Sequence, residues 1–439
     1  MAALNPLAQE LNGIIEAANP HVLEMLSDLG KRMFFPKGIL TQSAEAKQKA
    51  HKFNASIGIA LENGAPMYLP CVHKYFNGLD PKDLYPYATH GKPELRKRWR
   101  EKILVENPKL NGKPLGVPIV TAGVTSGLSL VADLFVNPGD VVVLPDLFWG
   151  NYRLTFVERA QGEIKTYPTY DARGAFNVAA LKETLLAEGK RKGKVIALLN
   201  FPNNPAGYMV NLKEANGIQE AILAAAKANI NLVVVTDDAY FGLVYDDHAL
   251  QESVFGWVAN MHERVLGIKL DGATKEEFVW GFRTGFMTYS PGGKVTDELL
   301  TALEKKTMGN IRASISNCAH PSQTIVLKAL DDPQFPIERK QKFALMKARA
   351  DKIHEVLKDP KYGEVMTMYP FNAGYFMCLK LKTVEAEPLR VHLLDKYGVG
   401  LISMGKVDLR IAFSCLEVDQ IQEMFEIIYR GIKDLEGKN

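Results

Sequence analysis

The sequence predicts an α/β protein in which a mostly parallel β-sheet is covered by helices. Three short runs of apolar, often β-branched residues carry this prediction, at Asp140–Leu144, Lys194–Asn200 and Asn231–Thr236. A helix-like stretch, Lys213–Ala228, separates the last two runs. Continuous apolar strands joined by helices are typical of parallel sheets that are buried on both faces.

Further elements of the same sheet are predicted on either side of this central part. Residues 1–60 look helical and then extended. Pro118–Thr121 leads as a strand into a helix over Ser126–Val136. Arg264–Leu270 and Glu277–Tyr289 are predicted as two more strands.

The C-terminal part shows a different order of elements. A long helix is predicted first, and three strands and a last helix follow it: Ile337–Leu357, Thr367–Tyr369, Gly374–Leu381, Val407–Phe413 and Glu417–Lys433. Strands and helices segregated in this way are typical of an α+β unit. We therefore expect a large domain over residues 61–330, and a smaller domain that joins an N-terminal arm, residues 1–60, to residues 331–439.

Composition restricts the class of protein. The 439 residues are 47% hydrophobic and 23% charged with a net charge of +3, so neither disorder nor a nucleic-acid or membrane partner is expected. The four cysteines form no CxxC pair, which excludes a zinc-finger spacing and favours a reducing compartment. No secretory signal is recognisable, and no apolar run approaches the roughly 20 residues that span a bilayer. We expect a cytoplasmic protein without a metal site.

Several polar residues follow the predicted strands directly. Asn204 comes after the strand that ends at Asn200, Asp237 after Asn231–Thr236, and Lys275 after Arg264–Leu270. Ligands of open parallel sheets bind at the carboxyl ends of the strands. These residue types are therefore expected to meet in one site.

Gly123–Leu128 lies at a predicted strand-to-helix junction. A helix N-terminus offers unpaired N–H groups and positive potential to a phosphate, here from Val124, Thr125 and Ser126. A plain N-cap would explain the same residues, because Ser and Thr are favoured there.

Asp237 directly follows an apolar strand, where a carboxylate needs a partner. A protonated pyridine nitrogen would be such a partner. Tyr240 and Asn204 could donate hydrogen bonds to the phenolic oxygen of the same ring. A helix cap, an ion pair or, for Asn204-Pro205-Ala206-Gly207, an ordinary turn are the alternatives.

Lys275 is the candidate for a Schiff base with an aldehyde, and Lys269 and Lys294 are its rivals. Arg283 follows Lys275 by eight residues, on a predicted apolar strand where a guanidinium needs an anion such as phosphate. Trp149 could stack on a flat heterocycle or pack in the core.

Arg410 lies inside a predicted strand of the small domain. It could bind a carboxylate ligand with two hydrogen bonds, or pair with a buried acid.

With these residues the chain resembles the class I/II aminotransferases of the pyridoxal-phosphate fold-type I group. Asn204-Pro-Ala-Gly resembles the family's Asn-Pro-x-Gly, and Asp237-x-Ala-Tyr240 its Asp-x-Ala-Tyr. The spacing from Lys275 to Arg283 matches that of its Schiff-base lysine and phosphate arginine. Gly123–Leu128, Trp149 and Arg410 are similar to its phosphate turn, its ring-stacking aromatic residue and its α-carboxylate arginine.

The resemblance implies the architecture and the cofactor. It implies a large domain with a mostly parallel, seven-stranded type of sheet and a smaller α+β domain. Pyridoxal 5′-phosphate would be held by Lys275 as an internal aldimine, in a homodimer with shared active sites.

Two stretches are similar to the aspartate/aromatic aminotransferase branch. Asn54–Gly58 resembles its opening glycine-containing strand, which implies a substrate-binding role for Gly58. Ile311–Asn317 resembles a segment whose arginine, here Arg312, binds a side-chain carboxylate in the neighbouring subunit.

The chain departs from the family at two places. Gly272-Ala273-Thr274 precedes the lysine where the family has serines, so Thr274 is expected to supply the phosphate hydroxyl. The tyrosine that reaches the neighbour's phosphate is assigned to Tyr85, with Tyr87 as the alternative.

We therefore expect ping-pong transamination between an amino acid, either aspartate/glutamate or aromatic, and a 2-oxo acid. A lyase or decarboxylase of the same fold type would use the same ring contacts. A non-catalytic regulator would need a DNA-binding addition, for which the chain has neither extra length nor a basic segment.

Overall fold

The computed structural model describes residues 4–35, 38–88 and 90–437. Its centre is a seven-stranded sheet in the order β4-β10-β9-β8-β7-β5-β6. The strands are β4 (Ile119–Thr121), β5 (Val141–Pro145), β6 (Glu163–Tyr167), β7 (Lys194–Asn200), β8 (Asn231–Asp237), β9 (Val265–Gly272) and β10 (Gly285–Pro291). Neighbours pair in parallel except β10, which runs antiparallel to both β4 and β9.

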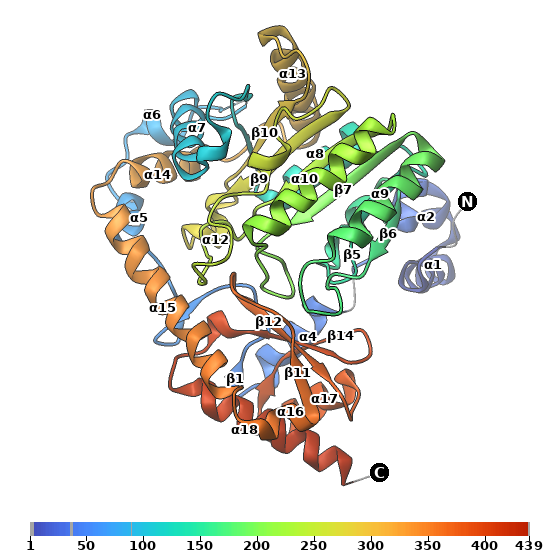
Figure 1. Cartoon of the computed structure of the whole chain (residues 1–439), viewed down its shortest axis with the longest axis vertical. Coiled ribbons are helices and arrows are strands. Elements are labelled where there is room, and N and C mark those ends of the chain that lie inside the picture. The colour runs from blue at the N-terminus through green and yellow to red at the C-terminus, as the bar shows by residue number, and fades with distance from the viewer. Residues whose placement is uncertain (1–3, 36–37, 89, 438–439) are drawn as a thin grey trace.

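Helices cover both faces of this sheet, as Figure 1 shows. Along β5, Val141 and Val143 enter the core that is shared with α9 (Val178–Lys192) and α10 (Leu212–Lys227). The alternate residues Val142 and Leu144 enter a second core with α8 (Val124–Phe135). Burial of both faces explains why these strands are continuously apolar. The predicted α/β class with a mostly parallel seven-stranded sheet is confirmed.

The strand register brings the ends of several strands to one edge. Asn200 at the end of β7 pairs with Asp237 at the end of β8, which pairs with Leu270 near the end of β9. Because β10 is antiparallel, it starts at this same edge, where Gly285 pairs with Gly272 and Thr121. The loops that follow β4, β7, β8 and β9 therefore meet the turn that precedes β10.

A second, four-stranded antiparallel sheet in the order β11-β12-β15-β14 forms the smaller α+β unit. Its strands and helices are β11 (Met366–Met368), β12 (Phe376–Leu381), β14 (Ile402–Met404), β15 (Asp408–Ala412), α16 (Pro360–Val365), α17 (Ala386–Tyr397) and α18 (Gln420–Glu436). The short β1 (Phe53–Asn54) pairs with β13 (Val399–Gly400), so the N-terminal part joins this unit. The domain boundaries near residues 60 and 330 stay predictions.

Helix α15 (Phe335–Val356) links the two units and runs along one side of the molecule in Figure 1. Its buried Arg349 donates to the carbonyl oxygens of Ser414 at 2.6 Å and Leu61 at 2.7 Å, and pairs with Glu417 at 2.8 Å. This guanidinium therefore fixes the helix to the small unit.

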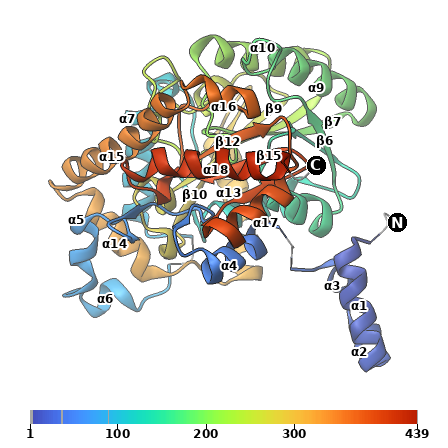
Figure 2. The same ribbon diagram turned by 90° about the horizontal axis from the view of Figure 1, so that it is seen from below.

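The first three helices form an arm that projects from the body in Figure 2. They are α1 (Pro6–Ala18), α2 (Pro20–Met25) and α3 (Asp28–Arg32). The arm touches the body where Arg32 donates to the carbonyl oxygen of Glu158 at 3.1 Å. Met25 is 80% exposed and Phe35, just after the arm, 68%.

The described chain also contains short elements and four longer helices, α4 (Ile39–Lys49), α7 (Pro93–Glu106), α13 (Asp297–Ser314) and α14 (His320–Leu330). The short elements include β2 (Leu61–Glu62), β3 (Ala65–Pro66), α5 (Pro70–His73), α6 (Pro81–Leu84), α11 (Phe255–Val258) and α12 (Ala273–Glu276). Within the described ranges, no helix is long and apolar enough to cross a membrane.

One predicted strand is wrong in its first half. Glu277–Tyr289 was expected to be extended throughout, but only the part from Gly285 belongs to β10. Phe278 and Arg283 have φ values of 56° and 54°, which turn the chain before the strand starts. The apolar side chains of Phe278 and Val279 are buried against the core of the large unit, so their hydrophobicity reflects packing in a turn and not a strand.

A glycine fixes the contact between the two units. Gly207 has a φ of 72°, and its carbonyl oxygen accepts N–H groups from Asn372 and Ala373 at 2.9 Å each. A Cβ at this position would lie 2.0 Å from the carbonyl oxygen of Phe376, which is backbone and cannot rotate away.

We predict that Gly207→Ala destabilises the protein by about 3 kcal/mol or more, because a left-handed alanine and the displacement of β12 both cost free energy. The free energy of unfolding from denaturant titration measures this. Gly363→Ala is the matched control, because Gly363 is helical and a Cβ added to it would meet nothing within 4 Å. The control should keep or slightly raise stability, and equal losses in both variants would contradict the role of Gly207.

Candidate active site

A cavity of about 320 Å³ lies at the carboxyl edge of the large sheet, between that edge and the small unit. The loops after β4, β7, β8 and β9 and the turn before β10 all contribute to it. Its lining consists of Gly58, Ile59, Val124, Thr125, Trp149, Tyr152, Asn200, Asn204, Asp237, Ala239, Tyr240, Thr274, Lys275, Arg283, Phe376 and Arg410. Most of the residues predicted from the sequence are therefore brought together.

Lys275 lies in the short helix α12, directly after β9. Its Nζ donates to the carbonyl oxygen of Gly58 at 3.1 Å and lies 5.3 Å from the centre of the Tyr240 ring. Burial, followed by the positive charges of Arg283 and Arg410, lowers the pKa of Lys275 to about 8. This amine is thus much closer to its neutral, nucleophilic form near neutral pH than an ordinary lysine.

The two rival lysines, Lys269 and Lys294, do not line the cavity. Lys269 is fully buried, and its Nζ forms ion pairs with Asp238 and, at 3.2 Å, with Asp271. Lys294 is exposed after β10 and does not line the cavity. Lys275 is the lysine that reaches the cavity.

Asp237 is 2% exposed at the end of β8. Its Oδ2 accepts the hydroxyl of Tyr152 at 2.7 Å, and its Oδ1 accepts the N–H of Ala239 at 3.2 Å. Burial raises the pKa of Asp237 to about 6, and these two hydrogen bonds oppose the rise. A cation in the cavity would favour the ionised form of this carboxyl group.

One end of the cavity suits a phosphate. Helix α8 begins at Val124, and Val124 and Thr125 line the cavity. The Arg283 guanidinium lies against Gly123, where a Cβ would be only 2.3 Å from its Nη2 atom. Thr274 adds a buried Oγ1 that has no hydrogen-bond partner among the described residues. An unpaired hydroxyl beside a cation and a helix N-terminus is a donor set for an anion.

Arg410 lies at the small-unit end of the cavity, 2% exposed on β15. Its Nη2 donates to the carbonyl oxygen of Ser56 at 3.0 Å and its Nη1 to Oδ1 of Asn204 at 3.4 Å. The guanidinium lies 4.2 Å from the centre of the Phe376 ring, and its Nε has no partner in the described part of the chain. Arg410 has no carboxylate partner within those residues, so the alternative of a buried acid is not what the structure shows.

Two aromatic residues of the prediction also line the cavity. Trp149 is half-buried and meets the Tyr152 ring edge-on, with centroids 5.6 Å apart. Tyr240 is buried and meets the rings of Tyr375 and Phe376 edge-on at 5.4 and 5.7 Å. Both rings are thus positioned by packing, and both still face the cavity.

Three predicted residues are not part of this cavity. Ser126 lies one position further along α8 than the residues that line it. Tyr85 is 79% exposed, with Tyr87 at 86%. Arg312 is exposed at the end of α13 and donates to Ser316 Oγ at 2.7 Å. Tyr85 and Arg312 were assigned to a neighbouring subunit's site, and these roles stay predictions.

Sequence reasoning missed several residues of the lining. Tyr152 is the most important, because it binds Asp237, and its place three residues after Trp149 was a usable helical signal. Asn200 donates to the carbonyl oxygen of Asp237 at 2.8 Å and accepts the N–H of Asn204 at 2.8 Å. Phe376 comes from the small unit, and nothing in the sequence relates it to Lys275.

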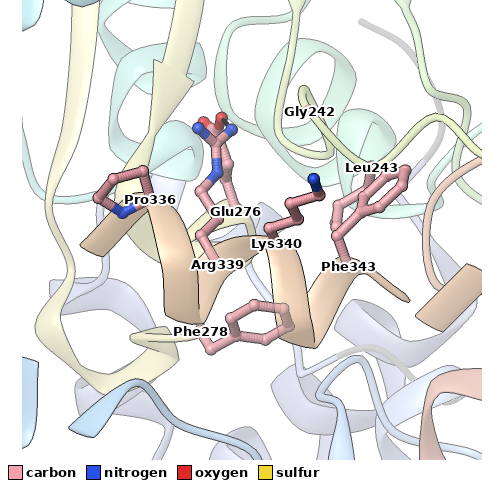
Figure 3. A pocket seen from close by; sticks show the side chains of 8 residues that line it. All are labelled: Gly242, Leu243, Glu276, Phe278, Pro336, Arg339, Lys340 and Phe343. Carbon is pink, nitrogen blue, oxygen red and sulfur yellow. Dashed lines mark hydrogen bonds and ion pairs between the residues drawn. The ribbon is translucent and has the colours of Figure 1, made fainter. Parts of the chain in front are cut away.

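A second cavity of about 240 Å³ lies beside the Lys275 helix (Figure 3). Half of its lining comes from α15, and Arg339 there forms an ion pair with Glu276, the residue after Lys275. Arg339 also pairs with Glu106 at 3.0 Å, and Lys102 with Glu276 at 2.9 Å. Because Arg339 and the buried Glu276 are already paired and Lys340 is exposed, we interpret this cavity as a structural contact between α15 and the Lys275 helix.

The cavity at the sheet edge fits pyridoxal phosphate. It offers an amine of lowered pKa for the aldehyde, a carboxylate for the ring nitrogen and an unpaired Thr274 hydroxyl beside Arg283 for the phosphate. Arg410 adds a buried positive charge whose Nε has no hydrogen-bond partner among the described residues.

Comparison with known proteins supports this interpretation. The sequence model of the family "Aminotransferase class I and II" matches residues 76–428. The LL-diaminopimelate aminotransferase of Dehalococcoides mccartyi strain BAV1 is 25% identical over 324 residues, covering 73% of this chain and 75% of its own. The aspartate aminotransferase of Sulfurisphaera tokodaii is also 25% identical, over 76% of this chain and 79% of its own.

Solved structures share the fold. An aminotransferase from Anaerococcus prevotii superposes with a TM-score of 0.82 at 22% identity, covering 93% of this chain and 99% of that one. A multiple substrate aminotransferase from Thermococcus profundus gives a TM-score of 0.78 at 18% identity, with coverages of 95% and 99%. The family match over most of the chain, together with this fold, identifies the protein as a member of the class I and II aminotransferases, which are pyridoxal-phosphate enzymes.

Proposed function

We propose that this aminotransferase acts on a dicarboxylic amino acid, aspartate or glutamate, or on an aromatic one, together with a 2-oxo acid. One observation carries the proposal: the buried Arg410 lines the cavity that contains Lys275 and Asp237, and no carboxylate of the described residues pairs with it. A buried guanidinium without a carboxylate partner can bind the α-carboxylate of an amino acid through two hydrogen bonds. The relatives named for aspartate and LL-diaminopimelate support an amino-acid substrate with a second polar end.

Each residue of the site has its own part in the reaction. The bound cofactor supplies an aldehyde and an electron sink. Arg410 orients the substrate's carboxylate, and the Lys275 amine takes the proton from the substrate's α-carbon and later returns one, as a general base and then acid. Asp237 would hold a negative charge for the ring nitrogen, Trp149 would stack on the ring, and Tyr240 would donate a hydrogen bond to its phenolic oxygen. The amino group passes between two substrates in turn, so ping-pong kinetics are expected.

The proposal includes a homodimer whose subunits complete each other's sites. Tyr85 and Arg312 are exposed polar candidates that do not reach the cavity of their own chain. A separate apolar groove supports an interface with a second copy, since Tyr68 and Phe76 line it and are 53% and 57% exposed. Exposed aromatic side chains of this size are typical of interfaces.

Replacement of Lys275 by Ala tests the assignment of the amine. We expect Lys275→Ala to lose turnover by several orders of magnitude, about 10⁴-fold or more, because the nucleophile and the proton carrier are both removed. The absorbance change on adding pyridoxal phosphate should also disappear. Lys294→Ala is the control and should keep both. If Lys275→Ala kept both the absorbance change and the turnover, the assignment of Lys275 as the reactive amine would be wrong.

The pKa of Lys275 predicts a pH dependence. Only the neutral amine attacks an aldehyde, so capture of pyridoxal phosphate by the protein freed of cofactor should quicken as pH rises and level off above the Lys275 pKa of about 8. Stopped-flow absorbance measures the rate. A rate that still increases up to the ordinary lysine pKa, about 10.4, would show that the amine is not perturbed.

The substrate side chain can be tested through Arg312. Transamination with 2-oxoglutarate should be compared for aspartate, phenylalanine, alanine and LL-diaminopimelate in the wild type and Arg312→Ala. If a partner's Arg312 binds a side-chain carboxylate, the variant should lose kcat/KM for aspartate by about 100-fold, the effect of removing one charge-assisted pair. Activity on alanine should change little. An unchanged preference for dicarboxylates would remove Arg312 from the site.

A further inference from the structure

Two adjacent carboxylates at the end of β8 have different partners. Asp238 is buried and forms an ion pair with Lys269, while Ser253 also donates to it at 2.5 Å. Asp237 accepts only from neutral donors, which are the hydroxyl of Tyr152 and the N–H of Ala239. Within the described ranges, Asp237 forms no ion pair. The negative charge of Asp238 is therefore neutralised by the fold, and that of Asp237 is not.

Tyr152 is held firmly in its position. It is 1% exposed, and its ring meets those of Trp149, Phe148 and Phe156 with centroids 5.6, 6.5 and 6.4 Å away. This packing on several sides keeps the hydroxyl 2.7 Å from Asp237 Oδ2. Close packing thus restricts the Tyr152 side chain to the rotamer that forms this hydrogen bond.

The phenol remains a donor throughout the working pH range. Burial and the neighbouring Asp237 carboxylate raise the pKa of Tyr152 well above 10. The groups that act on Asp237 are Tyr152, the Ala239 N–H, Asp238 and Lys275, and burial raises its pKa to about 6 while the Tyr152 hydrogen bond lowers it. The phenol thus favours the ionised carboxylate and adds no positive charge.

We propose that Tyr152 is a positioning residue, whose hydroxyl holds the Asp237 carboxylate ionised and oriented into the cavity while leaving its charge unpaired for the protonated ring nitrogen of the cofactor. A lysine or arginine in this place would also hold the carboxylate, but would compete with the ring nitrogen for its charge. The proposal rests on pyridoxal phosphate being bound in this cavity.

The test is the affinity of the cofactor-free protein for pyridoxal phosphate, measured by absorbance titration at pH values below and above the Asp237 pKa of about 6. Tyr152→Phe keeps the ring and removes the hydroxyl. We expect the Kd to rise about tenfold near neutral pH, and the pH below which binding weakens to move up by about one unit. The direction follows because Asp237 must be ionised to bind a cation, and loss of the donor raises its pKa.

Tyr167→Phe is the matched control. Tyr167 is also buried, on β6, and its hydroxyl has no hydrogen-bond partner in the described residues. Its variant should bind the cofactor as the wild type does. Equal Kd values and equal pH profiles for Tyr152→Phe and Tyr167→Phe would overturn the proposal.

A second probe separates this role from a general weakening of the fold. It is the cofactor analogue in which carbon replaces the ring nitrogen. The wild type should prefer pyridoxal phosphate, and Tyr152→Phe should reduce this preference about tenfold, since only the nitrogen senses Asp237. If Tyr152→Phe lost affinity equally for pyridoxal phosphate and for the carbon analogue, the role of Tyr152 would be merely structural. If the wild type failed to bind pyridoxal phosphate, the proposed function would fail, independently of the effect of Tyr152.

Discussion

The pairing register of the central strands positions the whole site. Asn200, Asp237 and Leu270 are neighbours across β7, β8 and β9, and the antiparallel β10 starts beside them at Gly285. A shift of one residue in any of these strands would turn its side chains to the other face of the sheet. Both faces are apolar, so the close packing of particular side chains against α8, α9 and α10 opposes such a shift and fixes the geometry of the site.

Charge is distributed unevenly around this edge. Lys275, Arg283 and Arg410 line one cavity with a single carboxylate, Asp237, so the site favours anionic ligands. Burial, followed by the positive charges of Arg283 and Arg410, lowers the pKa of Lys275 to about 8, so the two arginines that favour anions also contribute to the reactivity of the amine. Burial of unpaired charges is costly, and a fold tolerates them where a ligand provides the missing partner.

The two units depend on each other through the site. The large sheet supplies Lys275 and Asp237, whereas β15 and β12 supply Arg410 and Phe376. Gly207 connects the Asn204 loop to the small unit by two backbone hydrogen bonds. A movement of the small unit would therefore move Arg410 and the Asn204 loop together.

The sequence by itself determined the α/β class, the strands β7 and β8 and most of the cavity's polar residues, because apolar runs and strand-end positions are local patterns. It misplaced Arg283 on a strand, since hydrophobicity cannot distinguish a buried turn from a strand. The eight-residue spacing to Arg283 already selects Lys275 over Lys269 in the sequence. The tertiary structure gave the physical reason, because Lys269 is paired with Asp238 and, on its own strand, with Asp271. It also joined Tyr152 to Asp237 and Phe376 to Arg410, contacts between residues far apart in the chain that the register of the sheet and the docking of the small unit create.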